Sequence, residues 1–172
     1  MSLIFILGGA RSGKSSFALS LAGDRDKVTF VATALPLDEE MKSRIENHRK
    51  ERPSHWKTIE EPIDLLSVIK RFTDTGVIIL DCLTIWVSNL LERYKDEEIL
   101  EMAEDIASYS RSIRSEVIVI SNEVGLGIVP EYPLGRRYRD LLGRVNQIFA
   151  KHSNKTFFMI AGIPLEVKND SK

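Results

Sequence analysis

Eight residues near the start of the chain have the types and the spacing of a phosphate-binding loop. They are Gly8-Gly9-Ala10-Arg11-Ser12-Gly13-Lys14-Ser15. Gly8 and Gly13 allow the backbone to curl, so that its amide N–H groups point at a polyphosphate. Lys14 adds a cation for the β- and γ-phosphates, and the Ser15 hydroxyl suits Mg²⁺. The predicted chemistry is binding of a nucleoside triphosphate; the alternative is a glycine-rich turn with a solvated lysine.

The surroundings of this loop match what its chemistry requires. The apolar run Ile4–Leu7 predicts a strand that enters the loop, and the amphipathic run Ser16–Ala22 predicts a helix that leaves it. The N-terminal end of such a helix carries a partial positive charge, so it attracts the same anion. We therefore expect residues 8–15 to bind a nucleotide and Lys14 to take part in catalysis.

A second apolar run ends in a carboxylate. Val77–Leu80 is followed by Asp81, and an acid at this position helps to hold the magnesium shell in proteins with a phosphate-binding loop. The carboxyl ends of parallel strands are also where open α/β sheets bind ligands. Lys14, Ser15 and Asp81 thus form one hypothesis, with Ser15 and Asp81 as Mg²⁺ ligands. The alternative is an acid that merely begins a turn.

A further predicted strand, Val117–Ser121, leads into an unusual loop that extends to Pro130. The loop begins with Asn122 and Glu123 and contains two glycines, a composition typical of a tight backbone path at an active edge. An ordinary turn, with Asn122 bonding its own backbone, explains the same residues. Asn122 and Glu123 are therefore candidate site residues with both interpretations open.

Four arginines interrupt the apolar pattern of the next predicted helix, at positions 136, 137, 139 and 144. Arginine suits a bidentate grip on phosphate. Helical spacing places Arg136 and Arg139 on a different face from Arg137 and Arg144, so the four cannot all reach one site. Arg136 is the candidate phosphate contact, and a solvated helix face is the alternative for the group.

Two of the three histidines lie close together in a charged segment. A neutral imidazole can attack phosphorus, and His48 has Arg44 and Arg49 nearby to neutralise a phosphate. A surface helix that carries one histidine among charges is the alternative. His48 and His55 do not have the spacing of a zinc site, and His152, near a helix end, is expected to be inert.

The apolar runs alternate with amphipathic stretches, which predicts an α/β fold with a mostly parallel sheet and helices on both faces. The last residues, from Lys168 to Lys172, are expected to fray. The predicted strands are Leu3–Leu7, Val28–Ala32, a short one around Thr58-Ile59, Val77–Leu80, Val117–Ser121 and Thr156–Ala161. The predicted helices are Ser15–Ala22, Leu37–Glu51, Pro62–Thr73, Thr84–Tyr94, Ile99–Arg114 and Gly135–His152.

The composition limits the class of protein. The chain has 172 residues, which suits one nucleotide-binding domain over residues 1–172. Its net charge of -1 argues against a nucleic-acid or anionic-membrane binder, and no apolar run has the length of a membrane span. The single cysteine, Cys82, cannot form an internal disulfide, so a cytoplasmic location is expected. We expect Cys82 to be a buried structural thiol.

Several of these blocks together resemble one enzyme family. The residues concerned are the phosphate-binding loop, Asp81–Leu91, Ser121–Pro130 and Gly143–Gln147. They are similar to the bifunctional adenosylcobinamide kinase and adenosylcobinamide-phosphate guanylyltransferase family of cobalamin biosynthesis. The resemblance extends over nearly the whole chain, and the block Asn122–Pro130 is far more specific than the phosphate-binding loop.

The resemblance implies two reactions. A nucleoside triphosphate, ATP or GTP, phosphorylates the aminopropanol hydroxyl of adenosylcobinamide, and GTP then delivers GMP to adenosylcobinamide phosphate, which gives adenosylcobinamide-GDP and pyrophosphate. In this family the second step passes through a guanylylated histidine, and the matching residue here is His48. Some relatives have a second histidine where this chain has Asn47, so His55 is kept as the alternative nucleophile.

The resemblance also implies a three-layer, RecA-like P-loop NTPase fold and a homotrimer. Because His48 must approach the α-phosphorus, we expect the segment between Pro36 and Trp56 to move. Two other functions remain open at this point. One is a P-loop kinase or nucleotidyltransferase for another small acceptor, and the other is a GTP-dependent regulatory switch. The chain lacks the Asn-Lys-x-Asp block that reads guanine in regulatory GTPases.

Overall fold

A seven-stranded sheet forms the centre of the computed structural model, which describes residues 2–36, 39–50, 52–73 and 76–170. The strand order is β3-β2-β4-β5-β1-β6-β7, and every pairing is parallel except that of β6 with β7. The strands are β1 (Ser2–Gly8), β2 (Val28–Ala32), β3 (Lys57–Glu60), β4 (Val77–Asp81), β5 (Glu116–Asn122), β6 (Lys155–Ile160) and β7 (Ile163–Asn169).

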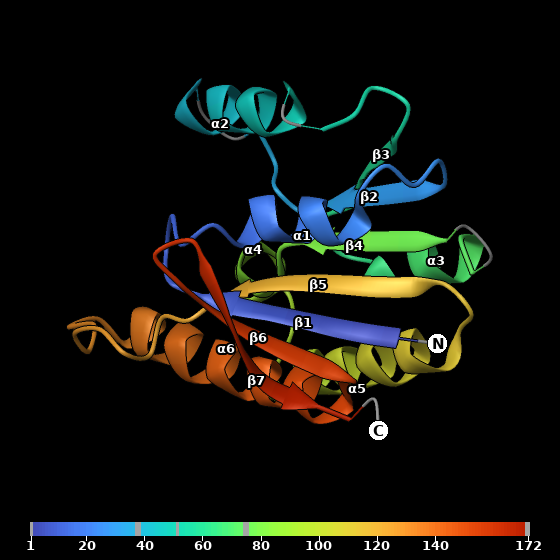
Figure 1. The fold of residues 1–172 in the computed structure, drawn as a ribbon. Helices are drawn as coiled ribbons and strands as arrows, with labels where there is room; N and C mark the ends of the chain where they lie inside the picture. The colour runs from blue at the N-terminus through green and yellow to red at the C-terminus, as the bar shows by residue number, and fades with distance from the viewer. Residues whose placement is uncertain (1, 37–38, 51, 74–75, 171–172) are drawn as a thin grey trace.

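Alternate side chains of the strands enter two separate apolar cores, because successive residues of a strand point to opposite faces. Leu3 and Phe5 of β1 pack in the larger core with four helices, α3 (Leu65–Arg71), α4 (Leu83–Leu90), α5 (Asp96–Ser112) and α6 (Pro133–His152). Ile4 and Ile6 pack in the smaller core with α1 (Lys14–Ala22). Figure 1 shows α1 on one side of the sheet and α5 and α6 on the other. The predicted three-layer α/β fold with helices on both faces is confirmed.

The helices occupy the predicted segments with shifted ends. They are α1 (Lys14–Ala22), α2 (Glu39–Lys50), α3 (Leu65–Arg71), α4 (Leu83–Leu90), α5 (Asp96–Ser112) and α6 (Pro133–His152). The expected helix from Pro62 begins only at Leu65, because the Asp64 carboxylate accepts a hydrogen bond from the Ser67 backbone and caps the helix there. Residues 37, 38 and 51 of the expected helix Leu37–Glu51 lie outside the described residues.

The expectation that the chain frays from Lys168 onward is wrong as far as residue 170. Strand β7 includes Lys168 and Asn169, and the backbone N–H of Asp170 donates to the carbonyl of Asn154 over 2.8 Å. The strand was missed because Pro164 interrupts the pattern, although proline is tolerated in an edge strand. Residues 171 and 172 lie outside the described part of the chain.

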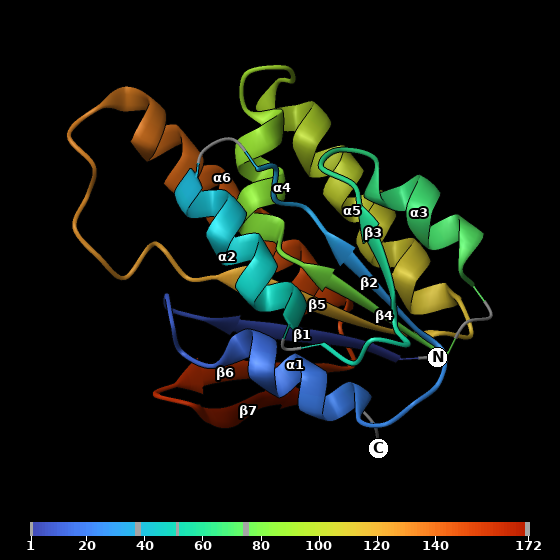
Figure 2. The same ribbon diagram turned by 90° about the horizontal axis from the view of Figure 1, so that it is seen from above.

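The carboxyl ends of β1, β4 and β5 meet at one edge of the sheet, because the three strands are neighbouring and parallel. The predicted site residues that follow these strands are therefore brought together. Helix α2 lies apart from the layer of α1 in Figure 1 and crosses in front of the sheet in Figure 2. Among the described residues, no helix is long and apolar enough to cross a membrane.

Candidate active site

The phosphate-binding loop turns between β1 and α1 through two residues with positive φ. Arg11 has φ 55° and Gly13 has φ 91°, the left-handed region that glycine enters without a steric penalty. A Cβ on Gly13 would lie 3.1 Å from the Cα of Gly162, in the turn between β6 and β7. The backbone N–H of Gly162 donates to the Ser12 carbonyl over 3.0 Å. The hairpin of β6 and β7 therefore braces the loop from the side.

The ammonium group of Lys14 lies inside this loop. Lys14 is only 8% exposed, and its Nζ donates to the Gly9 carbonyl over 2.5 Å, with the Ser12 hydroxyl 3.5 Å away. A hydrogen bond from a cation to an anionic phosphate oxygen is stronger than one to a neutral carbonyl. The lysine is thus already held where a phosphate can take over its hydrogen bond.

Ser15 and Asp81 come together as the sequence predicted. The Ser15 hydroxyl donates to Oδ2 of Asp81 over 3.1 Å, although the residues are 66 positions apart in the chain. A hydroxyl and a carboxylate are oxygen ligands of the kind that Mg²⁺ prefers, and this ion keeps several waters, so two protein ligands suffice. Within the described residues, no group of three or more His, Cys, Asp or Glu side chains forms a richer metal site.

The segment after Asp81 is fixed by a threonine from the neighbouring strand exit. The Thr33 hydroxyl accepts from the backbone N–H of Cys82 over 2.9 Å and lies within hydrogen-bond distance of the carbonyls of Asp81 and Cys82. Thr33 is fully buried. A buried polar group is stable only when it is hydrogen-bonded, and these bonds hold the backbone of the acid in place beneath Ser15.

The thiol of Cys82 borders the same cleft. Burial and the neighbouring Asp81 carboxylate raise the pKa of this thiol to about 11. The group is therefore neutral near pH 7, which does not suit a nucleophile. A neutral thiol agrees with the predicted structural role for Cys82, although the residue is partly rather than fully buried.

A cleft of about 480 Å³ joins the phosphate-binding loop to α2. Residues 10–16, Asp81, Cys82 and Asn122 line one side, and Met41, Ile45 and Arg52 line the other. Positions 41, 45 and 48 follow the i, i+4, i+7 spacing of one helical stripe. Helix α2 therefore places position 48 on the stripe that borders the cleft; the side chains of Arg44 and His48 lie outside the description.

Comparison with known proteins identifies the family. The family model described as "Cobinamide kinase / cobinamide phosphate guanyltransferase" matches residues 4–167. The chain belongs to this family. It is 38% identical over 180 residues to the "Bifunctional adenosylcobalamin biosynthesis protein CobU" of Escherichia coli (strain K12). This alignment covers 96% of the chain and 99% of the relative. The chain is 39% identical over 167 residues to the "Bifunctional adenosylcobalamin biosynthesis protein CobP" of Pseudomonas aeruginosa, with 96% of each chain covered.

Membership confirms the family resemblance seen in the sequence. A kinase and guanyltransferase family uses nucleoside triphosphates, so ATP and GTP fit as substrates of this chain. The match also spans both halves of the cleft, from the phosphate-binding loop through α2 to the hairpin of β6 and β7. The specific roles of individual residues do not follow from the match and rest on the geometry.

The arginines of α6 bind mostly to neighbouring backbone. Arg136, the candidate phosphate contact, donates to the carbonyls of Pro130 and Glu131, and Arg137 pairs with Asp96 at 2.7 Å. None of these arginines lines the cleft at the phosphate-binding loop. The structure thus gives Arg136 and Arg137 local contacts that hold the loop before α6 and the start of α5.

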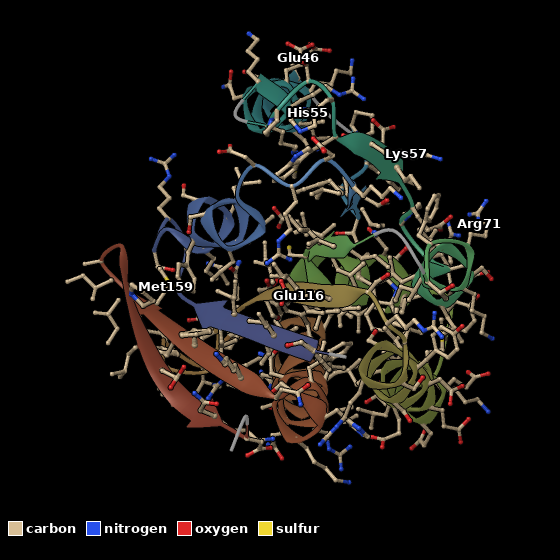
Figure 3. The ribbon with its side chains drawn as sticks, turned by 45° about the vertical axis from the view of Figure 1, so that its right-hand side comes forward. Glu46, His55, Lys57, Arg71, Glu116 and Met159 are labelled. Atoms are coloured by element: carbon tan, nitrogen blue, oxygen red, sulfur yellow. The ribbon has the colours of Figure 1, made fainter. Side chains whose placement is uncertain are left out.

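Glu123, Arg49 and His55 lie outside the lining of the cleft. The Glu123 carboxylate accepts from the backbone N–H of Gly125, and Arg49 donates to Glu60 of β3 over 3.4 Å. His55 is exposed, and Figure 3 shows it beside α2, far from Met159 of β6. Of the three, only Arg49 belongs to the helix that borders the cleft.

His152 has no place in this site. Its Nε2 lies 2.5 Å from Oε1 of Glu104, which links the end of α6 to α5. This agrees with the expectation that His152 takes no part in the chemistry.

Two polar residues that support this site, Arg52 and Thr33, were not proposed from the sequence. The Arg52 guanidinium lies 3.5 Å from the centre of the Phe30 ring and borders the cleft. Buried Thr33 supports the segment Asp81-Cys82. A sequence signal for Arg52 did exist, because the residue stands directly before Pro53, where the helix has to end. The sequence carried no comparable signal for Thr33, because its partners lie 48 and 49 positions away.

Proposed function

We propose that the chain catalyses both transfers of its family on the corrinoid. In the first, the γ-phosphoryl group of ATP or GTP passes to the aminopropanol hydroxyl of adenosylcobinamide. In the second, GMP passes from GTP to adenosylcobinamide phosphate, with pyrophosphate as the leaving group. The observation that carries the proposal is the cleft with Lys14, Ser15 and Asp81 on one side and the stripe of α2 that contains position 48 on the other.

In the kinase reaction, the loop and Lys14 stabilise the charge that develops on the transferred phosphoryl group. The backbone N–H groups of residues 10–15 and the N-terminus of α1 bind the phosphate oxygens. Ser15 and Asp81 would hold Mg²⁺, which would supply positive charge to the phosphates of the nucleotide. The acceptor hydroxyl attacks the phosphorus and gives up its proton to water, and the nucleoside diphosphate departs.

In the guanylyl reaction, a neutral imidazole nitrogen of His48 attacks the α-phosphorus of GTP. A nitrogen–phosphorus bond forms while the bond to the β-phosphate oxygen breaks, and pyrophosphate leaves. An oxygen of adenosylcobinamide phosphate then attacks the same phosphorus and releases the histidine. The phosphate-binding loop stabilises the leaving pyrophosphate in this reaction and the transferred group in the first.

The two reactions need different positions of α2. Attack at the α-phosphorus requires the imidazole to lie about 3 Å from that atom. We infer that the segment between Pro36 and Trp56 moves towards the loop when GTP binds. Support comes from the cores: among the described residues, neither apolar core contains a side chain of α2, so the helix can shift without breaking core packing.

The test uses GTP labelled at the α-phosphate, with Mg²⁺ and without a corrinoid. The protein is denatured, and its intact mass is measured for a GMP adduct that is labile in acid and stable in base. His48→Ala is the test variant and His55→Ala the matched control in the same part of the chain. We expect the adduct in the wild type and in His55→Ala, and none in His48→Ala.

Two results would contradict parts of the proposal. An adduct that persists in His48→Ala and disappears in His55→Ala would move the nucleophile to His55. No adduct in the wild type, with nucleotide binding intact, would remove the covalent guanylyl step. Phosphorylation of adenosylcobinamide, followed by the mass of the product, tests the kinase reaction separately. A chain that binds GTP and modifies no acceptor would be a regulatory switch.

We also propose a cytoplasmic location, where the one cysteine stays reduced. A separate proposal is that the chain forms a homotrimer. Support comes from two exposed apolar segments, the loop before α6 and the hairpin of β6 and β7, because isolated chains rarely expose so many large apolar side chains together. They are Leu126, Ile128, Val129, Ile160, Ile163, Leu165 and Val167. Light scattering after gel filtration should give three times the chain mass of 19.5 kDa; the mass of one chain would contradict the trimer.

A further inference from the structure

A buried asparagine on α6 holds the end of β5 at the active edge. Asn146 is only 6% exposed. Its Oδ1 accepts from the hydroxyl of fully buried Ser121 over 2.7 Å, and its Nδ2 donates to the carbonyl of Asn122 over 3.2 Å. One carboxamide thus uses both of its ends on two successive residues of the strand.

The same short segment is held from two other sides. The backbone N–H of Asn122 donates to the Thr84 hydroxyl over 2.7 Å, and the next N–H, that of Glu123, donates to the Gly8 carbonyl over 3.0 Å. Thr84 belongs to α4 and Gly8 to the start of the phosphate-binding loop. The main chain at Asn122 is therefore fixed by α4, α6 and β1 together.

Asn122 lines the cleft of the candidate active site. Strand β5 lies between β1 and β4, with Asn122 opposite Gly8 and Ile120 opposite Asp81. Asn122 follows Ile120, the residue opposite Asp81, by two positions. It therefore lies between the phosphate-binding loop and Asp81. A γ-phosphoryl group on a nucleotide held by Lys14 and Ser15 would lie in this gap.

The surroundings of Asn146 show that packing alone does not call for an amide. Its neighbours on the buried side of α6 include Leu142, Val145 and Phe149. A buried carboxamide is costly unless it is hydrogen-bonded, and an apolar side chain of similar size packs without that cost. The bonds of Asn146 go to the end of β5, which indicates that fixing this end is the reason for the amide.

We propose that Asn122 contacts the γ-phosphoryl group through its carboxamide, and that Asn146 is the positioning residue that aims it. The proposal rests on the proposed kinase reaction. Asn122 is the residue that touches the substrate; Asn146 acts only through it. Loss of either residue therefore affects the recognition of the γ-phosphate and the rate of phosphoryl transfer, and leaves the binding of the β-phosphate by the loop unchanged.

The first measurement is a binding ratio that needs no turnover. The affinities for GDP and for a non-hydrolysable GTP analogue are measured with Mg²⁺ in wild type, Asn122→Ala, Asn146→Ala and the double variant. The ratio of the affinity for the GTP analogue to the affinity for GDP should fall about tenfold in each single variant, because that is the size of one hydrogen bond to a charged group. The double variant should lose no more than Asn122→Ala alone. Equal weakening of both nucleotides, or additive losses, would overturn the proposal.

Further variants separate positioning from general stability. Asn146→Asp keeps an acceptor for the Ser121 hydroxyl but places a carboxylate against the Asn122 carbonyl. This variant should therefore lose its preference for the triphosphate over GDP to the same extent as Asn146→Ala. If Asn146→Ala fails to fold, Ser121→Ala offers a milder change with a smaller loss in the same direction. The control is Thr156→Val, which breaks the buried hydrogen bond between Thr156 and Ser153 (2.7 Å). This pair lies at the amino ends of the parallel strands, opposite the carboxyl ends that form the candidate site. The control variant should leave the ratio unchanged.

The rate of phosphorylation of adenosylcobinamide gives the second measurement. Asn146→Ala should lower kcat and leave KM for the acceptor nearly unchanged, with no further loss in the Asn122→Ala background. A wild type that binds the triphosphate selectively and phosphorylates no corrinoid would refute the proposed function and leave the binding ratio as the test of Asn146. A wild type that is active, with an unchanged ratio and kcat in both asparagine variants, would refute the role of Asn146.

Discussion

The two sides of the cleft are built differently. The phosphate-binding loop joins a strand and a helix of the core, and Ser12 and Lys14 are each only 8% exposed. Helix α2 is polar, stands apart in Figure 1, and contributes no described side chain to either core. We infer that the groups proposed to bind phosphate are preorganised, whereas the helix that contains His48 can change position without disturbing either core.

This difference suits the two proposed reactions. Electrostatic stabilisation is most effective when the charged groups do not have to reorganise during the reaction. A nucleophile that serves only one of two reactions has to leave room for the other acceptor. If α2 moves as proposed, the fixed loop and the movable helix would give one nucleotide site both properties.

The largest expected effect comes from removing the cation of the fixed side. Lys14→Ala should lower both transfers by about 10²- to 10³-fold, as expected when a group that stabilises transition-state charge is lost. Initial rates of phosphorylation and of GMP adduct formation measure this. The control is Lys70→Ala, which removes a lysine that lies over the Tyr109 ring on the far face. A Lys14→Ala variant that loses only one of the two activities would break the idea of one shared phosphate site.

The next effect tests how rigid the loop is. Gly13→Ala forces an L-residue to φ 91° and places its Cβ 3.1 Å from the Cα of Gly162. We expect a loss of about 1–3 kcal/mol in the free energy of unfolding and weaker binding of GTP and GDP alike. Gly9→Ala is the matched control, because an added Cβ there meets nothing within 4 Å. Equal behaviour of the two variants in urea unfolding would show that the loop adapts.

A smaller and more selective effect is expected on the movable side. Ile45→Ala removes a side chain that borders the cleft but belongs to neither core. It should cost less than about 1 kcal/mol of stability, whereas Ile118→Ala in the core of β5 should cost about 2–5 kcal/mol. Formation of the GMP adduct should slow several-fold in Ile45→Ala while phosphorylation stays near the wild-type rate. A large loss of stability in Ile45→Ala would place α2 with the rigid half of the molecule.

The sequence was most informative where chemistry and local structure coincide. The loop from Gly8 to Ser15 was identified because glycine, lysine and serine occur at the required spacing after an apolar strand. Asp81 was identified because it ends another apolar strand, and the 3.1 Å contact of Ser15 with Asp81 agrees with that interpretation. The parallel sheet explains this success, because it brings the ends of distant strands to one edge.

The sequence was least informative where a residue acts through distant partners. Asn146 lies in a helix of mixed composition, and its partners Ser121 and Asn122 are 25 and 24 positions away. Strand β7 was missed because Pro164 interrupts its pattern and because the tight turn before it contains Ala161, at φ 50°, a residue type that is not usual for such a turn. Long-range pairing and unusual backbone angles leave no spacing that a single sequence can reveal.

The last expected effect, which is confined to alkaline pH, concerns the thiol under the fixed side of the cleft. The pKa of Cys82 is raised from 9.0 to about 11 by burial and by Asp81. In the unfolded chain the thiol ionises from about pH 9, while in the folded chain it stays neutral, so its contribution to stability is present below pH 9 and is lost as the pH rises towards 11. Urea unfolding at pH 8, 9 and 10 should therefore show wild-type stability falling more steeply than that of Cys82→Ala. Parallel curves would mean that water reaches the thiol in the folded chain, and that the phosphate-binding half of the cleft is less closed than its buried loop and fixed strand ends indicate.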